Sequence, residues 1–187
     1  HLEPADTPLI AACDAGHDLA RRFLESKGFS VAGVAFEKRW DGEPEDVPRA
    51  FETARISEAR ERTTSWEVFR QGMADSWPPP PFDEESFRCP DTRVQVATVD
   101  TEAVGVLASR LSHGTWNIGG IGVLPHARNH GVGRALLCRE MSWAARGGFG
   151  VSMQVGSEEY RVLEWARNLG FWSVRTQTYY QRSKIEG

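Results

Sequence analysis

A glycine-containing turn between an apolar stretch and a helix-forming stretch constrains this chain more than any other feature. The apolar stretch spans residues 114–123, the turn reads LPHARNHG over residues 124–131, and a helix is predicted over residues 133–146. The apolar stretch has the length of a strand, and the helix is closed by the pair Gly147-Gly148. The segment therefore predicts a strand that runs through a tight turn directly into a helix.

The turn has the chemistry of an anion site. Gly131 and Gly133 carry no Cβ, so the backbone there can approach a ligand closely. Successive backbone N–H groups can point to one place at the helix N-terminus, where the partial positive charge favours anions. Arg128 and Arg134 add full charges. We expect a cradle for a pyrophosphate group.

Two other phosphate-binding loops fit this segment poorly. A P-loop requires Gly-Lys-Ser/Thr, which is absent here. A dinucleotide fingerprint requires a third glycine at the position of Leu136 and an acidic residue about 20 positions further on.

Strand-like and helix-like patterns alternate along the rest of the chain, which predicts an α/β or α+β fold with a mixed sheet. The predicted strands cover residues 7–13, 29–40, 93–99, 103–111, 114–123, 149–155 and 171–181. The predicted helices cover residues 17–27, 46–62, 65–75, 133–146 and 158–168. Residues 77–82, which read WPPPPF, predict a rigid connector beside a substrate pocket.

The chain also contains an internal repeat at an offset of 142 residues. Leu9–Cys13 falls on Val151–Val155, and Gly28-Phe29 falls on Gly170-Phe171. Both copies read strand, helix, Gly-Phe, strand.

Composition excludes several classes of protein. The 187 residues carry a net charge of −4, which argues against a general nucleic-acid binder. No apolar run is long enough to span a bilayer, and no basic-then-apolar leader opens the sequence, so we expect a cytoplasmic protein. Cys13, Cys89 and Cys138 form neither a disulfide framework nor a metal pair. His126 and His130 lack the third ligand that zinc requires, so we expect no metal.

Residues 123–133 resemble the acyl-CoA motif of the GNAT N-acetyltransferase superfamily, Val-x-Pro-x-x-Arg-x-x-Gly-x-Gly. The helix that ends in Asn-Leu-Gly-Phe before residue 172 is similar to the family's Lys-Leu-Gly-Phe ending. The resemblance covers residues 93–182 well and residues 31–92 loosely. It implies a mixed, mostly antiparallel central sheet flanked by helices, with a splayed strand pair that holds acyl-CoA, most simply acetyl-CoA, as co-substrate.

The resemblance also implies coenzyme contacts. Val123 backbone groups would bind the pantetheine arm and polarise the thioester carbonyl, and Glu159 occupies a position where relatives often have a coenzyme-binding Asn. The predicted coenzyme-binding residues are Ile121, Val123, Arg128, Asn129, His130, Gly131, Val132, Gly133, Arg134 and Glu159.

The catalytic groups are less defined. Where many relatives carry a proton-donating Tyr, this chain has Ala166, and the strand over residues 115–122 has no carboxylate. Tyr179 and Tyr180 lie on opposite faces of a strand, so one of them could reach the pocket. His113 is a further candidate beside the Val123 N–H, because imidazole is a common general acid or base.

The repeat suggests a domain division. Its offset is about one GNAT domain length, so residues 1–40 resemble the C-terminal end of a preceding GNAT domain and residues 41–187 resemble a complete one. This arrangement is similar to the tandem proteins of the mycothiol synthase type. Alternatively, residues 31–40 supply the first strand of a single domain.

We therefore expect an acyl-CoA-dependent N-acyltransferase that transfers acetyl to a primary amine of a small molecule. The alternative is a degenerate domain that binds acyl-CoA without catalysis. Expected partners are the amine and either a second copy of the chain or a preceding GNAT domain, with no nucleic acid and no membrane.

Overall fold

The computed structural model describes residues 8–48, 54–76 and 82–182. The strands are β1 (Leu9–Asp14), β2 (Ser30–Trp40), β3 (Arg55–Glu58), β4 (Thr92–Val99), β5 (Glu102–Ser112), β6 (Thr115–Val123), β7 (Gly150–Gly156) and β8 (Trp172–Arg182). The α-helices are α1 (Asp18–Ser26), α2 (Arg62–Gly72), α3 (Glu84–Arg88), α4 (Val132–Arg146) and α5 (Tyr160–Asn168). Short 3-10 helices occupy Pro44–Asp46 and Pro125–Ala127.

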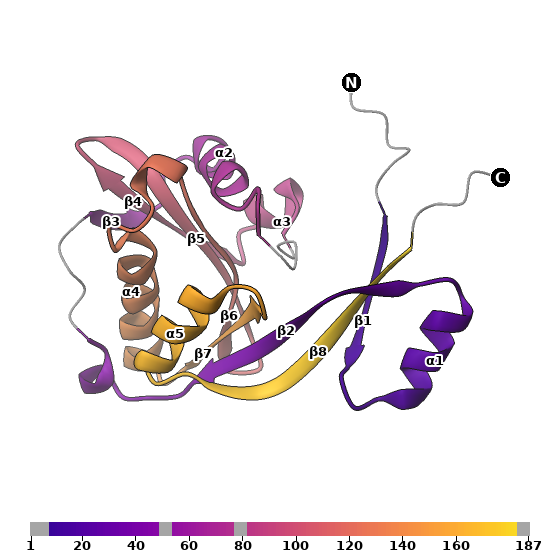
Figure 1. Ribbon diagram of the computed structural model, residues 1–187. Coiled ribbons are helices and arrows are strands. Elements are labelled where there is room, and N and C mark those ends of the chain that lie inside the picture. The colour runs from indigo at the N-terminus through magenta and orange to yellow at the C-terminus, as the bar shows by residue number, and fades with distance from the viewer. Residues whose placement is uncertain (1–7, 49–53, 77–81, 183–187) are drawn as a thin grey trace, which may run out of the picture.

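The strands form one eight-stranded sheet in the order β1-β8-β2-β7-β6-β5-β4-β3 (Figure 1). The β6–β7 pair is parallel and the other described pairs are antiparallel. The predicted mixed, mostly antiparallel sheet flanked by helices is confirmed. The strand β2 comes early in the sequence, yet it lies between β7 and β8 from the end of the chain.

One predicted element is wrong. The helix expected over residues 46–62 is replaced, where the structure describes the chain, by β3, which pairs with β4 at the edge of the sheet. Ile56 is the half-buried residue of β3, whereas Arg55, Ser57 and Glu58 are exposed. Residues 49–53 lie outside the described residues.

The single-turn helix α3 was not predicted from the sequence. The carboxylate of Asp83 caps it by accepting a hydrogen bond from the Ser86 N–H at 2.7 Å. Hydrogen bonding by the Ser86 side chain, and then by its backbone, holds the pKa of Asp83 below its usual value. The proline-rich connector lies outside the described residues except for Phe82, which is buried.

Helices cover both faces of the sheet (Figure 1). On one face α4 packs through Leu136, Leu137 and Met141, which are fully buried with the β7 residue Val151, and α5 packs through Ala166. On the other face α2 and α3 supply an aromatic cluster of Trp66, Phe69 and Phe87, whose ring centroids lie 5.2–5.8 Å apart. The two cores fix the sheet between α2 and α4, and the candidate site forms there. The strands β1, β2 and β8 extend from this body and carry α1.

A carboxyl group is fully buried between α4 and the sheet. Glu140 accepts hydrogen bonds from Ser109 Oγ at 2.8 Å and from Gln95 Nε2, and the Arg93 guanidinium lies 4.0 Å away. Burial raises the pKa of Glu140 above its ordinary value, although Ser109, Arg93 and Gln95 oppose the shift. Gln95 Oε1 is a buried acceptor without a hydrogen-bond partner.

We expect the free energy of unfolding of Glu140→Gln to increase relative to that of the wild type as the pH rises. The folded protein holds the Glu140 proton more tightly than the unfolded chain, so its contribution to stability is lost as pH rises through the folded-state pKa. Glutamine does not ionise, and its N–H can bond Gln95 Oε1, which is worth on the order of 1 kcal/mol. Urea unfolding between pH 4 and 8 measures both free energies, and the difference in favour of the variant should grow with pH. The exposed Glu164→Gln is the control, and a pH-independent difference would contradict the expectation.

Candidate active site

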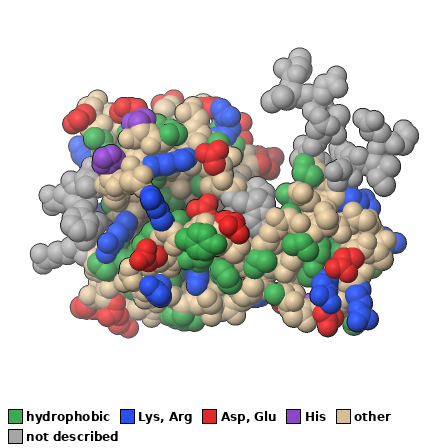
Figure 2. Space-filling view, in the orientation of Figure 1, with side chains coloured by type: hydrophobic (Ala, Val, Ile, Leu, Met, Phe, Trp, Pro, Cys, Tyr) green, Lys and Arg blue, Asp and Glu red, His purple; other side chains and the backbone are tan. Residues whose placement is uncertain are grey.

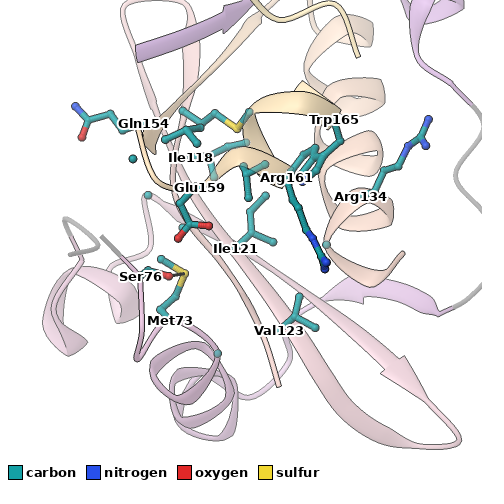
Figure 3. A pocket seen from close by; sticks show the side chains of 18 of the residues that line it. Met73, Ser76, Ile118, Ile121, Val123, Arg134, Gln154, Glu159, Arg161 and Trp165 are labelled. Carbon is teal, nitrogen blue, oxygen red and sulfur yellow. Dashed lines mark hydrogen bonds between the residues drawn. The ribbon is translucent and has the colours of Figure 1, made fainter. Parts of the chain in front are cut away.

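A cavity of about 870 Å³ opens where β6 and β7 separate. The two strands pair only over Thr115–Ile118 and Gly150–Met153, and beyond these residues no pairing joins them. The cavity is lined by the unpaired ends of both strands, by the start of α4 and by the end of α2 (Figure 3). The predicted splayed strand pair is present, and the space between its strands is open.

The separation leaves backbone N–H groups of β6 without a strand partner. Leu124 N donates to Val104 O at 2.9 Å, across to the β5 side. Since N–H groups alternate along a strand, those of Ile121 and Val123 point to the other side, where β7 has moved away. Val123 O accepts from Arg128 Nε at 3.0 Å. The N–H of Val123 is therefore a donor facing the cavity.

The turn before α4 has the geometry that its sequence predicted. Gly131 has a φ of +81° and Asn129 a φ of +65°, both in the left-handed region that glycine and asparagine tolerate. The helix begins at Val132, so the N–H groups of its first turn have no acceptor within the helix. A Cβ at Gly133 would lie 3.6 Å from Val123 Cγ2 and 3.8 Å from Ile121 Cγ2. A larger side chain there would enter the cavity.

Three arginines surround this helix N-terminus. Arg128, Arg134 and Arg161 all line the cavity, and Figure 2 shows basic side chains gathered on that face of the molecule. Arg161 Nη1 donates to Asn129 Oδ1 at 2.8 Å, which fixes the turn to α5. This end of the cavity is suited to a polyanion.

Arg128 has a further, structural role. Its Nη2 donates to Gly72 O at 3.2 Å, at the end of α2, in addition to the Nε bond to Val123 O. It also lies 3.7 Å from Asp75. Arg128 therefore holds the end of β6 against α2 while it lines the cavity.

A row of polar side chains forms the β7 side of the cavity. Ser152 Oγ donates to Asn117 Oδ1 at 2.6 Å, and Gln154 Nε2 donates to Gln177 Oε1 at 2.7 Å. Glu37 on β2 pairs in register with Gln154, and its carboxylate lies 3.1 Å from Arg175 Nε. Met73 and Ser76, from the turn that follows α2, face this row across the cavity (Figure 3).

Most of the predicted coenzyme residues meet at this cavity. Those that line it are Ile121, Val123, Arg128, Asn129, Gly131, Val132, Gly133, Arg134 and Glu159. His130 is exposed and is not a lining residue. His126 lies 3.5 Å from Glu102.

The predicted catalytic side chains lie outside the lining. His113 occupies the β5–β6 turn with a φ of +50°, and its Nδ1 is hydrogen-bonded to Ser112 Oγ at 2.8 Å. Tyr180 is 1% exposed and faces α1, because strand alternation puts it on the side opposite Tyr179. The Tyr179 hydroxyl donates to Gln154 Oε1 at 2.6 Å. Tyr179 therefore contacts a lining residue without lining the cavity itself. Burial raises the pKa of Tyr179.

Among the lining residues that the sequence did not predict are Glu37, Gln154, Arg161 and Arg175. Glu37 and Arg175 reach the cavity region because β2 inserts beside β7, which no local pattern indicates. Arg161 had a signal, since a helix predicted to start near residue 158 places it in the first turn.

Two classes of site receive no support in the part of the chain that the structure describes. No group of three or more His, Cys, Asp or Glu side chains there could hold a metal ion. No helix among these residues has the length and apolarity that crossing a membrane requires.

Known structures share this fold. A GCN5-related N-acetyltransferase from Sphaerobacter thermophilus superposes with a TM-score of 0.72 at 18% identity, covering 96% of this chain and 60% of that one. A tandem GNAT protein from the clavulanic acid biosynthesis pathway gives a TM-score of 0.65 at 12% identity, covering 97% and 64%. The ribosomal-protein-S18-alanine N-acetyltransferase from Escherichia coli gives 0.55 at 16% identity, covering 72% and 96%. The chain thus spans less than two thirds of the first two proteins. A comparison with curated proteins finds no match.

The family model named acetyltransferase (GNAT) family matches residues 55–173, which is more than half of the chain. The match contains the splayed strands, the turn and α4. The fold of this family implies an acyl-CoA co-substrate, and the cavity fits one, with unpaired N–H groups on β6 and an anion cradle at α4. The chain belongs to the GNAT acetyltransferase family.

Proposed function

We propose that this chain is an acyl-CoA-dependent N-acyltransferase that transfers acetyl from acetyl-CoA to a primary amine. One observation carries the proposal: the open edge of β6 and the N-terminus of α4 face the same cavity. The open edge of β6 suits the thioester end of acetyl-CoA, and the N-terminus of α4 suits its pyrophosphate.

The donor half of the cavity has a clear division of roles. The first-turn N–H groups of α4, with Arg134 and Arg161 beside them, would hold the pyrophosphate. The N–H groups of Ile121 and Val123 would hold the pantetheine arm as an added strand. Gly133 leaves the space that the arm requires.

The chemistry requires few additional groups. The acetyl carbon exchanges its bond to sulfur for a bond to nitrogen, the amine loses one proton, and the thiolate gains one. The Val123 N–H would donate to the carbonyl oxygen as its negative charge develops, which is the role of an oxyanion hole. The amine must be neutral to attack, and free alkyl amines have a pKa near 10.

The acceptor half of the cavity carries the carboxylate that such an amine needs. Glu37 is half-buried and is held by Arg175 beside the polar row of Gln154. A carboxylate there would attract the ammonium form of the substrate and take its proton through water. Glu37 thus serves the acceptor, whereas the arginines at α4 serve the donor.

We expect Glu37→Gln to lower kcat/KM for the amine by about 10-fold or more, on the usual scale for a group that assists proton transfer. The Kd for acetyl-CoA should stay within about 2-fold, because the glutamine keeps the shape and leaves the α4 end untouched. Initial rates and calorimetry measure the two constants. Glu164→Gln on α5 is the control. If Glu37→Gln weakened acetyl-CoA binding by the same factor as it lowered kcat/KM, the assignment would be contradicted.

The function itself is tested on the wild-type chain. Calorimetry with acetyl-CoA and desulfo-CoA measures binding, and thiol release measures turnover with an aminoglycoside, a free amino acid and a peptide with an N-terminal alanine. The first and last follow the acceptors named for structural neighbours, an aminoglycoside acetyltransferase complex with sisomicin and the S18-alanine enzyme. Absence of acetyl-CoA binding at millimolar concentration would overturn the proposal.

The competing function is a domain that binds acyl-CoA without turnover. The observation that favours it is the absence of Tyr179, Tyr180 and His113 from the cavity lining. Binding with no thiol release above the buffer rate across an extended amine panel would support this alternative. Release that depends on Glu37 would exclude it.

A further inference from the structure

The chain contains two copies of one strand–helix–strand unit, and their bounds correspond residue for residue. A shift of 142 residues carries α1 (Asp18–Ser26) onto α5 (Tyr160–Asn168) and β2 (Ser30–Trp40) onto β8 (Trp172–Arg182). The same shift carries β1 onto β7 apart from the first residue of β7.

The pairing registers obey the same shift. In the β2–β7 pair Ala35 lies opposite Gly156, and in the β1–β8 pair Gln177 lies opposite Asp14. These two pairs are images of each other under the shift. The hydrogen bonds that follow them, Ser157 N to Val34 O and Ala15 N to Thr176 O, are images as well. A local two-fold therefore relates β1 to β7 and β2 to β8.

The two copies differ in what covers them. The outer edge of β7 pairs with β6, and α4 covers its inner side, so Val151, Met153 and Val155 are 0–5% exposed. In the described part of the chain β1 ends the sheet, and no strand pairs with its outer edge. Leu9, the image of Val151, is 44% exposed.

The helix shows the same difference. Ala166 on α5 is fully buried in the same hydrophobic core as α4, whereas α1 has no buried residue. Leu19 and Phe23, one turn apart on α1, are 76% and 60% exposed. Apolar side chains exposed together beside an open strand edge are typical of a surface that another element covers.

We propose that the outer edge of β1 and the apolar side of α1 bind the strand–helix unit of a second GNAT-type domain, carried by the polypeptide segment before β1. The two-fold specifies the arrangement: a strand parallel to β1, as β6 is to β7, and a helix in the position of α4. Parallel neighbours need a crossover connection, and α4 joins β7 through three residues, so the occupant precedes β1 in the same chain.

This arrangement gives each unit a strand of the other. The strand β2 lies in the sheet beside β7 and brings Glu37 to the described cavity. Its image β8 lies beside β1 and carries Tyr179, the image of Glu37, opposite Ala12 of β1. The inference does not depend on the proposed acyl transfer, because no coenzyme or activity enters its test.

Hydrogen exchange on single amides tests the proposal. Ala15 N bonds to β8, so by alternation the N–H groups of Ala11 and Cys13 also face β8, whereas those of Ile10, Ala12 and Asp14 face the open edge. A polypeptide that includes the proposed preceding segment is compared with the 187-residue chain. The Ile10 amide is the image of Ser152, within the β6–β7 pairing, and should exchange at least 100-fold more slowly in the longer protein. The Ala12 and Asp14 amides are images of Gln154 and Gly156, where β6 and β7 have separated, and should change much less, with the β8-facing amides as internal references.

Variants give a second readout. Phe23→Glu, at the image of the core-contacting Trp165, should lower the Tm of the longer protein by at least 5 °C and leave that of the 187-residue chain unchanged. Arg22→Glu on the same helix should change neither. Equal exchange in both proteins, a reading frame without such a segment, or protection of the edge amides by dimerisation of the 187-residue chain alone would each overturn the proposal.

Discussion

Gly133→Leu should weaken acetyl-CoA binding by at least about 100-fold, which is close to 2.7 kcal/mol, while the protein stays folded. Gly133 lies within the first turn of α4, where leucine is a good helix former. Its Cβ position already touches Val123 and Ile121 at 3.6 and 3.8 Å, so the rest of a leucine would occupy the space between β6 and α4. Calorimetry with acetyl-CoA measures the loss, and thermal unfolding verifies the fold.

Gly133→Ala is the matched control for this variant. Its methyl group makes ordinary van der Waals contacts, so binding should change by less than about 5-fold. If the leucine variant bound acetyl-CoA as the wild type does, the coenzyme would not pass between Gly133 and β6. If alanine alone abolished binding, the space would be tighter than the cavity indicates.

Gly72→Ala should lower the Tm by about 5–10 °C, a loss of about 2–3 kcal/mol. A Cβ at Gly72 would lie 2.4 Å from Val123 N and 2.5 Å from Gly122 C. Both atoms belong to the backbone of β6, so they cannot rotate away, and α2 must move outward. That movement would also strain the bond from Arg128 to Gly72 O, so acetyl-CoA binding should weaken as well.

The control for this prediction is Gly16→Ala. No atom lies within 4 Å of a Cβ at Gly16, so its Tm should stay within about 1–2 °C of the wild type. Differential scanning calorimetry of both variants distinguishes close packing of α2 on β6 from a general cost of replacing glycine. A Gly72→Ala variant as stable as Gly16→Ala would contradict the packing argument.

The donor side of the site could be predicted from the sequence because it depends on local structure. Within eleven residues the segment from Val123 to Gly133 specifies a strand end, a turn with positive φ and a helix start. Each is set by neighbours in the chain, through the missing Cβ of glycine and the unpaired N–H groups of a first helical turn. The repeat was visible for the same reason, since each copy is a local strand–helix–strand pattern.

The predictions that failed concern elements whose structure depends on partners distant in sequence. Residues 46–62 have apolar side chains spaced for a helix, yet β3 forms because the edge of β4 offers hydrogen bonds. The acceptor side was missed for a similar reason. Glu37 and Gln154 are 117 positions apart in sequence, and only the insertion of β2 beside β7 brings them together.

The sequence by itself therefore determined the α/β class, the family resemblance and the anion cradle at α4, because short-range backbone geometry encodes all three. Only the tertiary structure decided which strand lies beside β7, which face Tyr179 and Tyr180 take, and that Glu37 reaches the cavity. Strand order and register follow from which apolar faces and backbone edges can be buried together, and that competition involves the whole chain.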